Sequence, residues 1–571
     1  MKTSQYNFSD SISTYKQCQY LTDILIANNV RYAILSPGSR NAPLIINFAR
    51  ESRIKSWVIV DERSAAFAAI GIAQFTDSPV AIVCTSGSAV LNYAPAISEA
   101  YYRNIPLIVI SADRPEEWID QNDSQTIRQF GVLANIVKRS YNLPARCDDA
   151  TSSWYADRII NDAVISAVTA PQGPVHLNMP FRDSLCVTTT KKNINTRIIG
   201  HPGIKRNLDK QFMESLVHEI ANADSVLIAA GFNSHSNELN AALGNLACHK
   251  NIVVLTETIS NLHDKRFINT IDRVLSCMPR EDAKEYAPQL LITFGGSFVS
   301  KVLKKFLRKY PSLQEWRIGI EHDTVDTMQH LTTRIDIEPT QFFSSLDALM
   351  TDTFNPNATY SEKWHALAGQ AMSWHNQFTN CIPWCDLKAF SIFMPMIPQN
   401  YILHLSNGTC IRYAQLFGMR SGMKCFSNRG VSGIDGSTST ALGTSLVATD
   451  YTSLLITGDM SFSYDINGLT SQYNSARFKI IVMDNQGGNI FRFINGPSDL
   501  PELEKYFEVQ RSIPVKDYAR AFGFDYFEAD DETSLKSVLP VFFASRSQSI
   551  LAIHTPPETN AKVLRSYFRM Q

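Results

Sequence analysis

The sequence predicts an α/β protein that is built from three doubly wound parallel sheets. Short runs of β-branched residues alternate with longer segments of helical periodicity along the whole chain, as is typical of parallel sheets. The 571 residues are also too many for one hydrophobic core, and three domains of about 150–200 residues fit this length. We expect α/β domains at residues 1–187, 208–350 and 364–571.

The first domain is predicted from hydrophobic runs that end in small or turn-forming residues. A helix with Leu21, Ile24 and Leu25 on one face precedes the first run. The runs are YAILSPGSR (32–40), SWVIVDE (56–62), VAIVCTSGS (80–88), PLIVISADRP (106–115) and VHLNMP (175–180). Because ligands bind at the carboxyl ends of parallel strands, the polar residues that close these runs are candidates for a site.

Two polar stretches separate the expected domains. Residues 188–210 carry Gly and Pro without clear periodicity and are interpreted as a linker, and the pattern breaks again at 351–363. The hydrophobic runs of the second and third domains are 224–234, 251–258, 290–297, 401–409, 425–430, 453–459, 478–488 and 549–555.

Composition excludes several classes of function. The formal net charge is −1, from 53 basic and 54 acidic side chains, so no overall field favours nucleic acid. No window approaches the apolar length of a membrane span and no signal region opens the chain, so we expect no membrane insertion. The closest of the ten cysteines, Cys381 and Cys385, do not form a CxxC motif. Reduced thiols in a cytoplasmic protein, without a structural metal, are the interpretation.

The most informative segment is LLITGDMSF, which is followed by KIIVMDNQGGNIF. Two predicted strands end at Asp459 and Asn485, and YDINGLTSQYN between them has helical spacing, so both polar residues fall at one sheet edge. The Asp carboxylate, the Asn amide oxygen and the carbonyl of Gly487 are hard ligands that suit Mg2+ together with diphosphate oxygens. The amino end of the helix after Asp459 also suits an anionic diphosphate. A Gly-Asp pair alone is common, so the prediction depends on both strand ends.

This pair of strand ends resembles the thiamine-diphosphate signature GDG…N. Met460 stands where the superfamily has Gly, and the synthases of 2-succinyl-5-enolpyruvyl-6-hydroxy-3-cyclohexene-1-carboxylate (SEPHCHC) usually carry an apolar residue there. The resemblance implies thiamine diphosphate with Mg2+, or Mn2+ in its place, as cofactors. It also adds Gly458 to the cofactor contacts.

Glu62 is the candidate for the carboxyl group that bonds the aminopyrimidine N1′ of such a cofactor. It follows a predicted strand and opens the alanine-rich helix of VIVDERSAAFAAIGIAQ. Apolar surroundings would shift its pKa enough for it to share a proton. An acid in a first helical turn can also serve only as a partner of the helix dipole. The presence of Asp459 and Asn485 in the same chain favours the catalytic role.

Segments over most of the first and last thirds resemble SEPHCHC synthases, whereas the middle third resembles them weakly. They are SPGSRNAPL, DERSAAFAAIGIA, CTSGSAVLNYAPAISEAYY, SADRPEE, SNRGVSGIDGSTSTALG and DNQGGNIF. The resemblance implies pyrimidine-binding, central and diphosphate-binding domains of the thiamine-diphosphate enzyme fold. It implies decarboxylation of 2-oxoglutarate and addition of the resulting succinic-semialdehyde carbanion to isochorismate, giving SEPHCHC and CO2 in menaquinone biosynthesis. A homodimer or homotetramer with active sites shared between subunits is also implied.

The two substrates carry four carboxylates, which arginine binds well because its guanidinium is bidentate. By resemblance, the substrate contacts are Ser39, Arg40, Arg114, Gln125, Lys301, Arg412 and Arg429. The resemblance also assigns Ile434 to support the bent cofactor and Ile490 and Phe491 to the wall of the substrate pocket. Plain core packing is the alternative for these apolar residues.

Two positions depart from the family pattern, and other functions stay open. Val302 stands where many members carry Arg, and Gly408 where several have Ser. Another thiamine-diphosphate 2-oxoacid decarboxylase or an acetolactate-synthase-like carboligase is the nearest alternative. A nucleotide- or flavin-binding module would depend on AAGFNS, a poor match to GxGxxG. A non-catalytic member of the superfamily is disfavoured by the retention of Glu62, Asp459 and Asn485.

Overall fold

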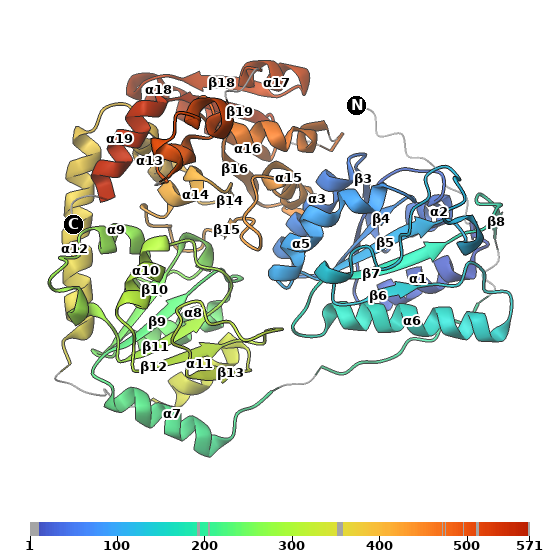
Figure 1. Cartoon of the computed structure of the whole chain (residues 1–571), viewed down its shortest axis with the longest axis horizontal. Coiled ribbons are helices and arrows are strands. Elements are labelled where there is room, and N and C mark those ends of the chain that lie inside the picture. The colour runs from blue at the N-terminus through green and yellow to red at the C-terminus, as the bar shows by residue number, and fades with distance from the viewer. Residues whose placement is uncertain are drawn as a thin grey trace. The chain divides into compact units, whose positions relative to one another are not determined.

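The computed structural model describes residues 11–190, 194–203, 206–350, 358–470, 472–473, 476–494, 496–509 and 513–568. In this part of the chain, three parallel sheets alternate with helices, which confirms the predicted fold class (Figure 1). The chain forms two compact units. The N-terminal unit holds residues 1–204, 430–449 and 465–473, and the C-terminal unit holds 205–429, 450–464 and 474–571. The three domain boundaries expected from the sequence stay a prediction.

The sheet of the N-terminal unit has six parallel strands in the order β3-β2-β4-β5-β7-β6. They are β2 (Tyr32–Leu35), β3 (Lys55–Val58), β4 (Val80–Cys84), β5 (Leu107–Asp113), β6 (Ser140–Asn142) and β7 (Val175–Pro180). One face is covered by α1 (Lys16–Ala27), α2 (Ala42–Arg50) and α6 (Ala150–Val168). The other face is covered by α3 (Glu62–Thr76) and α5 (Ala94–Tyr102), with the short α4 (Ala89–Asn92) between them in sequence (Figure 1). Strands β4, β5 and β7 are wholly buried, which explains why they read as continuous apolar runs.

Helix α15 (Ser437–Val447) packs against α3 inside the N-terminal unit, and the two helices are close enough for their backbones to touch. A Cβ atom on Gly71 would lie 2.0 Å from the carbonyl oxygen of Thr440, and one on Gly443 would lie 2.0 Å from that of Ala68. The hydroxyl of Thr444 donates a hydrogen bond of 3.0 Å to the Gly71 carbonyl oxygen. The two glycines therefore hold α15 against the helix that begins with Glu62.

We expect Gly443→Ala to destabilise this unit, because the new methyl group collides with the backbone of α3 rather than with a movable side chain. Overpacking of this kind costs about 1–3 kcal/mol. Gly369→Ala is the matched control, since Gly369 lies in the long helix α12 (Tyr360–Cys381) and a Cβ there meets no atom within 4 Å. The control should gain about 0.5–1 kcal/mol from helix propensity. Thermal unfolding checks both variants, and equal melting temperatures would contradict the packing argument.

The central sheet belongs to the C-terminal unit and has the strand order β10-β9-β11-β12-β13. Its strands are β9 (Val226–Ala230), β10 (Ile252–Thr256), β11 (Leu290–Phe294), β12 (Gln314–Ile318) and β13 (Thr333–Ile335). One face packs against α7 (Lys210–Asn222), α8 (Asn237–Leu246) and α11 (Pro339–Leu349). The other face packs against α9 (Ile271–Ser276), α10 (Lys301–Lys309) and α12.

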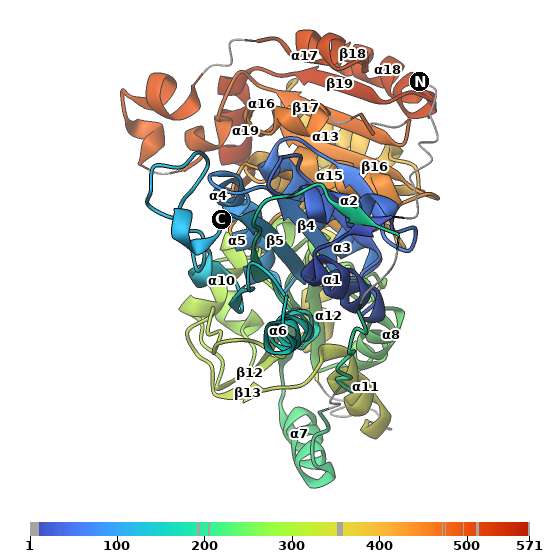
Figure 2. The same ribbon diagram turned by 90° about the vertical axis from the view of Figure 1, so that its right-hand side faces the viewer.

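The third sheet has the order β15-β14-β16-β17-β19-β18, and Figure 2 shows β18 beside β19. Its strands are β14 (Tyr401–Leu405), β15 (Cys425–Phe426), β16 (Thr452–Gly458), β17 (Phe478–Asp484), β18 (Asp525–Ala529) and β19 (Ser549–His554). One face is covered by α13 (Asp386–Phe393), α14 (Thr409–Ala414), α18 (Glu532–Ala544) and α19 (Pro557–Phe568). Helices α16 (Asp459–Tyr464) and α17 (Val515–Ala521) contact the strands as well.

Short helical turns complete the described elements. The 3₁₀ turns are η1 (Glu116–Trp118), η2 (Ala134–Ile136), η3 (Thr258–Ser260), η4 (Ala283–Tyr286), η5 (Met394–Met396), η6 (Ile466–Thr470), η7 (Asn489–Arg492) and η8 (Pro497–Asp499). A π-helical turn spans η9 (Leu503–Glu508). The helix predicted over YDINGLTSQYN is instead the 3₁₀ turn η6 after α16, and residues 471 and 474 of that segment lie outside the described residues.

The predicted linker at 188–210 is partly ordered. Its first residues form β8 (Thr188–Thr189), which pairs antiparallel with β1 (Ile12–Ser13). The side chain of Asn161 also accepts a hydrogen bond from the backbone of Ile199 at 2.9 Å. Residues 191–193 and 204–205 of this linker, and 351–357 of the second break, lie outside the described residues.

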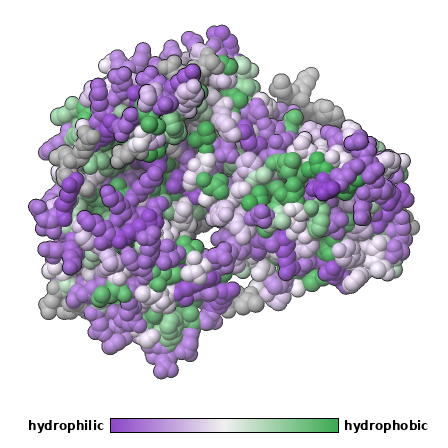
Figure 3. Space-filling model, viewed as in Figure 1, coloured by the Kyte–Doolittle hydropathy of each residue, from purple (hydrophilic) through white to green (hydrophobic). Residues whose placement is uncertain are grey.

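The surface is mainly polar on the face drawn in Figure 3, and the cysteines of the described chain are not paired. Polar side chains cover much of the face drawn in Figure 3, with apolar side chains gathered in smaller areas. Across the described residues, no helix combines the length and apolarity needed to cross a membrane. All ten cysteines lie in the described part of the chain and are free thiols.

Candidate functional site

Asp459 and Asn485 follow the carboxyl ends of β16 and β17, which pair in parallel within the C-terminal unit. The Asp459 carboxylate accepts hydrogen bonds from the backbone amides of Met460 and Gly487, both at 2.8 Å. Asp459 and Asn485 are 1% and 3% exposed. The structure therefore brings together the carboxylate, the amide side chain and the loop backbone that the sequence assigned to a metal ion.

The loop after β17 requires glycine at position 487. Gly487 has a φ of +134°, and a Cβ atom there would lie 2.7 Å from the carbonyl oxygen of Glu508. The same carbonyl accepts a hydrogen bond of 2.7 Å from the amide of Gly488. Only glycine adopts this backbone without strain, so the chain needs glycine at this position of the loop.

These residues fit a Mg2+ ion that is shared with a diphosphate. They offer one carboxylate, one amide oxygen and one backbone carbonyl, and Mg2+ completes such a set with phosphate oxygens and water. Over the described ranges, no group of three or more His, Cys, Asp or Glu side chains could hold a metal ion by itself. A metal at this sheet edge would therefore depend on mixed oxygen donors.

Sequence analysis missed Asp386, the first residue of α13. Its carboxylate accepts a hydrogen bond of 2.9 Å from the Asn485 side-chain amide. Asp386 is fully buried, and burial raises its pKa to about 6. A single acid in a first helical turn is ordinary, and it lies 99 residues before its partner, so no sequence signal pointed to the contact.

Glu62 opens α3 in the N-terminal unit. The side chain of Asp61 caps the helix by accepting a hydrogen bond of 3.0 Å from the amide of Ser64. Glu62 itself is partly buried, and burial is the main cause that raises its pKa, with a further contribution from Asp61. A hydrogen bond from Asn92 opposes this shift. The pKa of Glu62 is thus displaced in the direction that sharing a proton requires.

The loop that carries Ile434 lies against the helix of Glu62. A Cβ atom on Gly436 would fall 2.2 Å from the ring of Phe67, a residue of α3, so the loop backbone touches α3. Ile434 is 42% exposed, which is unusual for a large apolar residue beside a buried helix. The loop next to Ile434 therefore packs against α3 at Phe67.

Arg40 and Arg114 follow β2 and β5 of the N-terminal sheet. The Arg40 guanidinium donates hydrogen bonds to the carbonyl oxygen of Phe181 at 3.0 Å and to the carboxylate of Asp183 at 3.2 Å. Arg114 is partly buried and forms an ion pair with Asp123 at 3.4 Å. Both arginines are thus held by other groups of the same unit.

Ser39 directly precedes Arg40 in the sequence, and Gln125 lies in the segment that follows Arg114. Both residues are exposed. The backbone of Gln125 approaches the turn after β4, because a Cβ atom on Gly87 would lie 3.0 Å from the Gln125 carbonyl oxygen. The Gln125 backbone therefore lies near the carboxyl edge of the sheet.

Arg412 and Arg429 lie near each other in the C-terminal unit. Burial lowers the pKa of Arg412, and the charge of Arg429 lowers it further. Arg412 donates a hydrogen bond to the carbonyl oxygen of Gly408, and Arg429 donates one of 2.8 Å to the side chain of Asn407. Two guanidinium groups at one place suit a ligand with more than one carboxylate.

Helix α10, which packs on the central sheet, carries Lys304, a lysine that the sequence did not single out. Lys301 is exposed, and Val302 packs on the apolar cluster beneath α10. Lys304 is partly buried, and its pKa is lowered by burial and by the charge of Arg429, while Glu257 opposes this shift. Lys304 is therefore the α10 amine that lies near Arg429. Sequence reasoning missed it because α10 carries several lysines.

Glu257 is a buried acid beside these cations. It is 2% exposed and accepts hydrogen bonds from the backbone amides of Val299 at 2.8 Å and Ser300 at 2.7 Å. Burial nevertheless raises its pKa to about 7. The folded protein therefore binds the Glu257 proton more tightly than the unfolded chain does.

This shift predicts a pH-dependent contribution to stability. The contribution is fully present below the ordinary glutamate pKa and is lost as the pH rises through about 7. Relative to Glu257→Gln, the native protein should lose stability between about pH 5 and about pH 8, by about 1–3 kcal/mol. Denaturant unfolding at several pH values measures the difference. Glu285→Gln, an exposed change, is the control, and a difference independent of pH would contradict the prediction.

Ile490 and Phe491 follow the loop of Asn485 and Gly487 closely, in η7. Both are partly buried. A Cβ atom on Gly488 would lie 3.1 Å from the Phe491 ring, which also packs against Phe507 with the ring centroids 5.5 Å apart. Phe491 thus has a packing role of its own, as the alternative interpretation of the sequence allowed.

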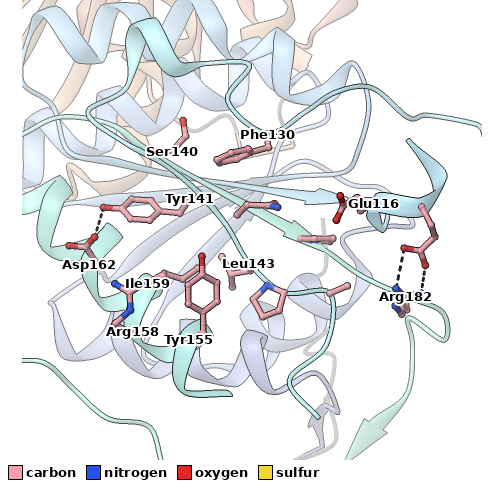
Figure 4. Close-up of a pocket in the computed structure, with 15 residues that line it drawn as sticks. Glu116, Phe130, Ser140, Tyr141, Leu143, Tyr155, Arg158, Ile159, Asp162 and Arg182 are labelled. Carbon is pink, nitrogen blue, oxygen red and sulfur yellow. Dashed lines mark hydrogen bonds and ion pairs between the residues drawn. The ribbon is translucent and has the colours of Figure 1, made fainter. Parts of the chain in front are cut away.

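A separate pocket of about 630 Å3 lies in the N-terminal unit (Figure 4). Aromatic residues such as Phe130, Tyr141 and Tyr155 line it, and Arg182 and Glu117 form an ion pair at its edge. None of the site residues predicted from the sequence is among its lining residues. We therefore place no part of the predicted site in this pocket.

Comparison with known proteins identifies both ends of the chain. Residues 16–132 match the family described as thiamine pyrophosphate enzyme, N-terminal TPP binding domain, and residues 407–553 match the corresponding C-terminal TPP binding domain. A SEPHCHC synthase of Porphyromonas gingivalis is 41% identical over 97% of this chain and 97% of its own. One of Flavobacterium johnsoniae is 40% identical over 96% of this chain and 98% of its own.

A solved structure shows the same fold. Benzoylformate decarboxylase from Polynucleobacter necessarius superposes with a TM-score of 0.70, covering 95% of this chain and 98% of that chain. The sequence identity is 14%, so this likeness bears on the fold alone.

Proposed function

Because the chain belongs to the family of 2-succinyl-5-enolpyruvyl-6-hydroxy-3-cyclohexene-1-carboxylate synthases, we propose that it decarboxylates 2-oxoglutarate and joins the remaining four-carbon unit to isochorismate. The products are SEPHCHC and CO2, in menaquinone biosynthesis. The observation that carries this proposal is the similarity to these synthases over nearly the whole chain. We further propose that the reaction takes place in the cytoplasm, where free thiols persist.

The proposed cofactors are thiamine diphosphate and Mg2+, with Mn2+ as the alternative ion. Asp459, Asn485 and the carbonyl of Gly487 would hold the metal, and Gly458 would border the diphosphate. The buried Asp459 carboxylate and its hydrogen bond from the Gly487 amide support this assignment. When bound, thiamine diphosphate supplies the carbanion stabilisation that side chains lack.

Glu62 would hold a proton at the aminopyrimidine N1′. Burial raises the pKa of Glu62, and this direction supports the role because it favours sharing a proton with N1′. Ile434 would support the cofactor from the loop that lies against α3. Both groups come from the N-terminal unit, and the metal ligands come from the C-terminal unit.

The cationic side chains would bind the four substrate carboxylates. This set comprises Arg40, Arg114, Lys301, Arg412 and Arg429, and we add Lys304 because it lies near Arg429. Ser39 and Gln125 would add polar contacts, and Ile490 and Phe491 would exclude water from one wall. The neighbouring charges of Arg412 and Arg429 support this role most directly, because an anionic ligand would relieve their repulsion.

The functional unit is proposed to be a homodimer, or a homotetramer made of such dimers, with active sites shared between subunits. The apolar residues around Glu62 support this proposal. Val60, two residues before Glu62, is 73% exposed, and Val58 and Ile434 are 40% and 42% exposed. A second subunit that covers this surface would bury them and exclude water from the site.

The test is a substrate assay with purified protein, thiamine diphosphate and Mg2+. We expect 2-oxoglutarate to be consumed, with CO2 release, when isochorismate is present, and pyruvate to be left unused. Consumption of pyruvate with formation of acetolactate would instead support the carboligase alternative. Loss of 2-oxoglutarate at the same rate without isochorismate would indicate a simple decarboxylase.

A further inference from the structure

The side chain of Asn485 is held by a buried network of hydrogen bonds that joins Asp386, Thr555 and Asn560. Its side-chain amide nitrogen donates to one carboxylate oxygen of Asp386 at 2.9 Å. The hydroxyl of Thr555 donates to the other oxygen at 2.5 Å. The side chain of Asn560 donates to the Thr555 hydroxyl at 3.1 Å and accepts from the Asp386 backbone amide at 2.7 Å. Each of the four residues is at most 4% exposed.

This arrangement determines which end of the Asn485 amide is available. A carboxylate only accepts hydrogen bonds, so the amide nitrogen must face Asp386. The amide oxygen then lies on the side away from Asp386, and no described residue donates a hydrogen bond to it. A metal ligand of this kind requires its oxygen to point outward.

We propose that Asp386 is a positioning residue that orients the Asn485 amide so that its oxygen, and not its nitrogen, faces the metal ion. This inference rests on the proposed function, because it requires Mg2+ at Asp459 and Asn485. Partners behind metal ligands orient them in this way, and their loss weakens metal binding by about 10–100-fold. Thr555 holds the second oxygen of Asp386 and thereby fixes the plane of its carboxylate.

Asp386→Asn tests the proposal through metal affinity. The new amide can donate to the Asn485 oxygen, which would turn the Asn485 nitrogen toward the metal. We expect the apparent Kd of Mg2+, measured by titration calorimetry with thiamine diphosphate present, to rise by about 10–100-fold. Glu315→Gln is the control for loss of a buried acid, because Glu315 is 1% exposed and lies in the central sheet. Its Kd should equal that of the native protein.

The double variant that combines Asp386→Asn with Asn485→Asp is the rescue. It reverses the hydrogen bond and returns an oxygen to the metal side, so the Mg2+ affinity should recover most of its loss. Unchanged affinity in Asp386→Asn, or no recovery in the double variant, would overturn the positioning role. If Asp386→Asn fails to fold, Thr555→Val takes its place with a smaller expected loss, and native affinity there would overturn the proposal. A native protein that binds no Mg2+ with thiamine diphosphate would contradict the proposed function itself.

Discussion

Glu62→Gln should lower turnover about 100- to 10,000-fold while thiamine diphosphate and Mg2+ still bind. The amide keeps the size of the side chain and can still hydrogen bond, but it cannot hold or release a proton at the aminopyrimidine. The proposed metal ligands lie in the other unit of the chain and are untouched by the change. Steady-state kinetics with 2-oxoglutarate and isochorismate gives the turnover, and calorimetry gives the cofactor affinity.

The chain offers a matched control for this variant. Glu532 is the first residue of α18 and follows the capping Asp531, just as Glu62 follows the capping Asp61 in α3. Glu532→Gln therefore makes the same chemical change at the same helical position, but at an acid that pairs with Lys388 and Lys536 and has a lowered pKa. It should leave turnover unchanged. Comparable turnover in the two variants would reduce Glu62 to a helix-stabilising residue.

Asp459→Ala should abolish the metal-dependent binding of thiamine diphosphate, with an affinity loss of at least about 100-fold. The variant removes the buried carboxylate from the predicted ligand set and leaves the Gly487 amide without its acceptor. Titration calorimetry of thiamine diphosphate, with and without Mg2+, measures the loss. Higher Mg2+ concentrations should restore little of the binding.

Asp450→Ala provides the comparison for Asp459. Asp450 is exposed and lies just before β16, at the opposite end of the strand from Asp459. The Asp450→Ala variant should bind thiamine diphosphate with the affinity of the native protein. If Asp459→Ala also kept its affinity, the ligand assignment at this sheet edge would be wrong.

The strand ends were predictable because the pattern of a parallel sheet fixes where polar residues go. Asp459 and Asn485 each close an apolar run, and neighbouring parallel strands bring such ends to one edge. The contact between Asp459 and the Gly487 backbone follows from this geometry. The position of Glu62 at the start of α3 follows in the same way from the end of β3 and the alanine-rich pattern.

Contacts between distant segments could not be predicted from local patterns. The bond from Asn485 to Asp386 spans 99 residues, and neither partner looks unusual in its own segment. Lys301 and Lys304 lie three residues apart on one side of α10, and only the tertiary packing leaves the first exposed and the second partly buried. The packing of α15 on α3 depends on Gly71 and Gly443, which read as ordinary helical glycines until the two helices meet. Each of these features depends on tertiary structure rather than on periodicity.

Strands β12 and β13 were missed for a different reason. The sequence QEWRI of β12 mixes charged and apolar residues, although four of its five residues are buried. Glu315 and Arg317 are buried with partners from other elements, among them Thr293 and Glu321. Paired polar residues inside a sheet do not follow the apolar pattern on which strand prediction depends.

The central claim is that each active site joins Glu62 of one subunit to Asp459 of another around one cofactor. The most direct test is to produce Glu62→Gln and Asp459→Ala chains together, with different affinity tags, and to purify the mixed dimer. One of its two sites would then hold both native residues, so the mixed dimer should show about half of the native turnover. Turnover as low as that of the two single variants would contradict the shared site.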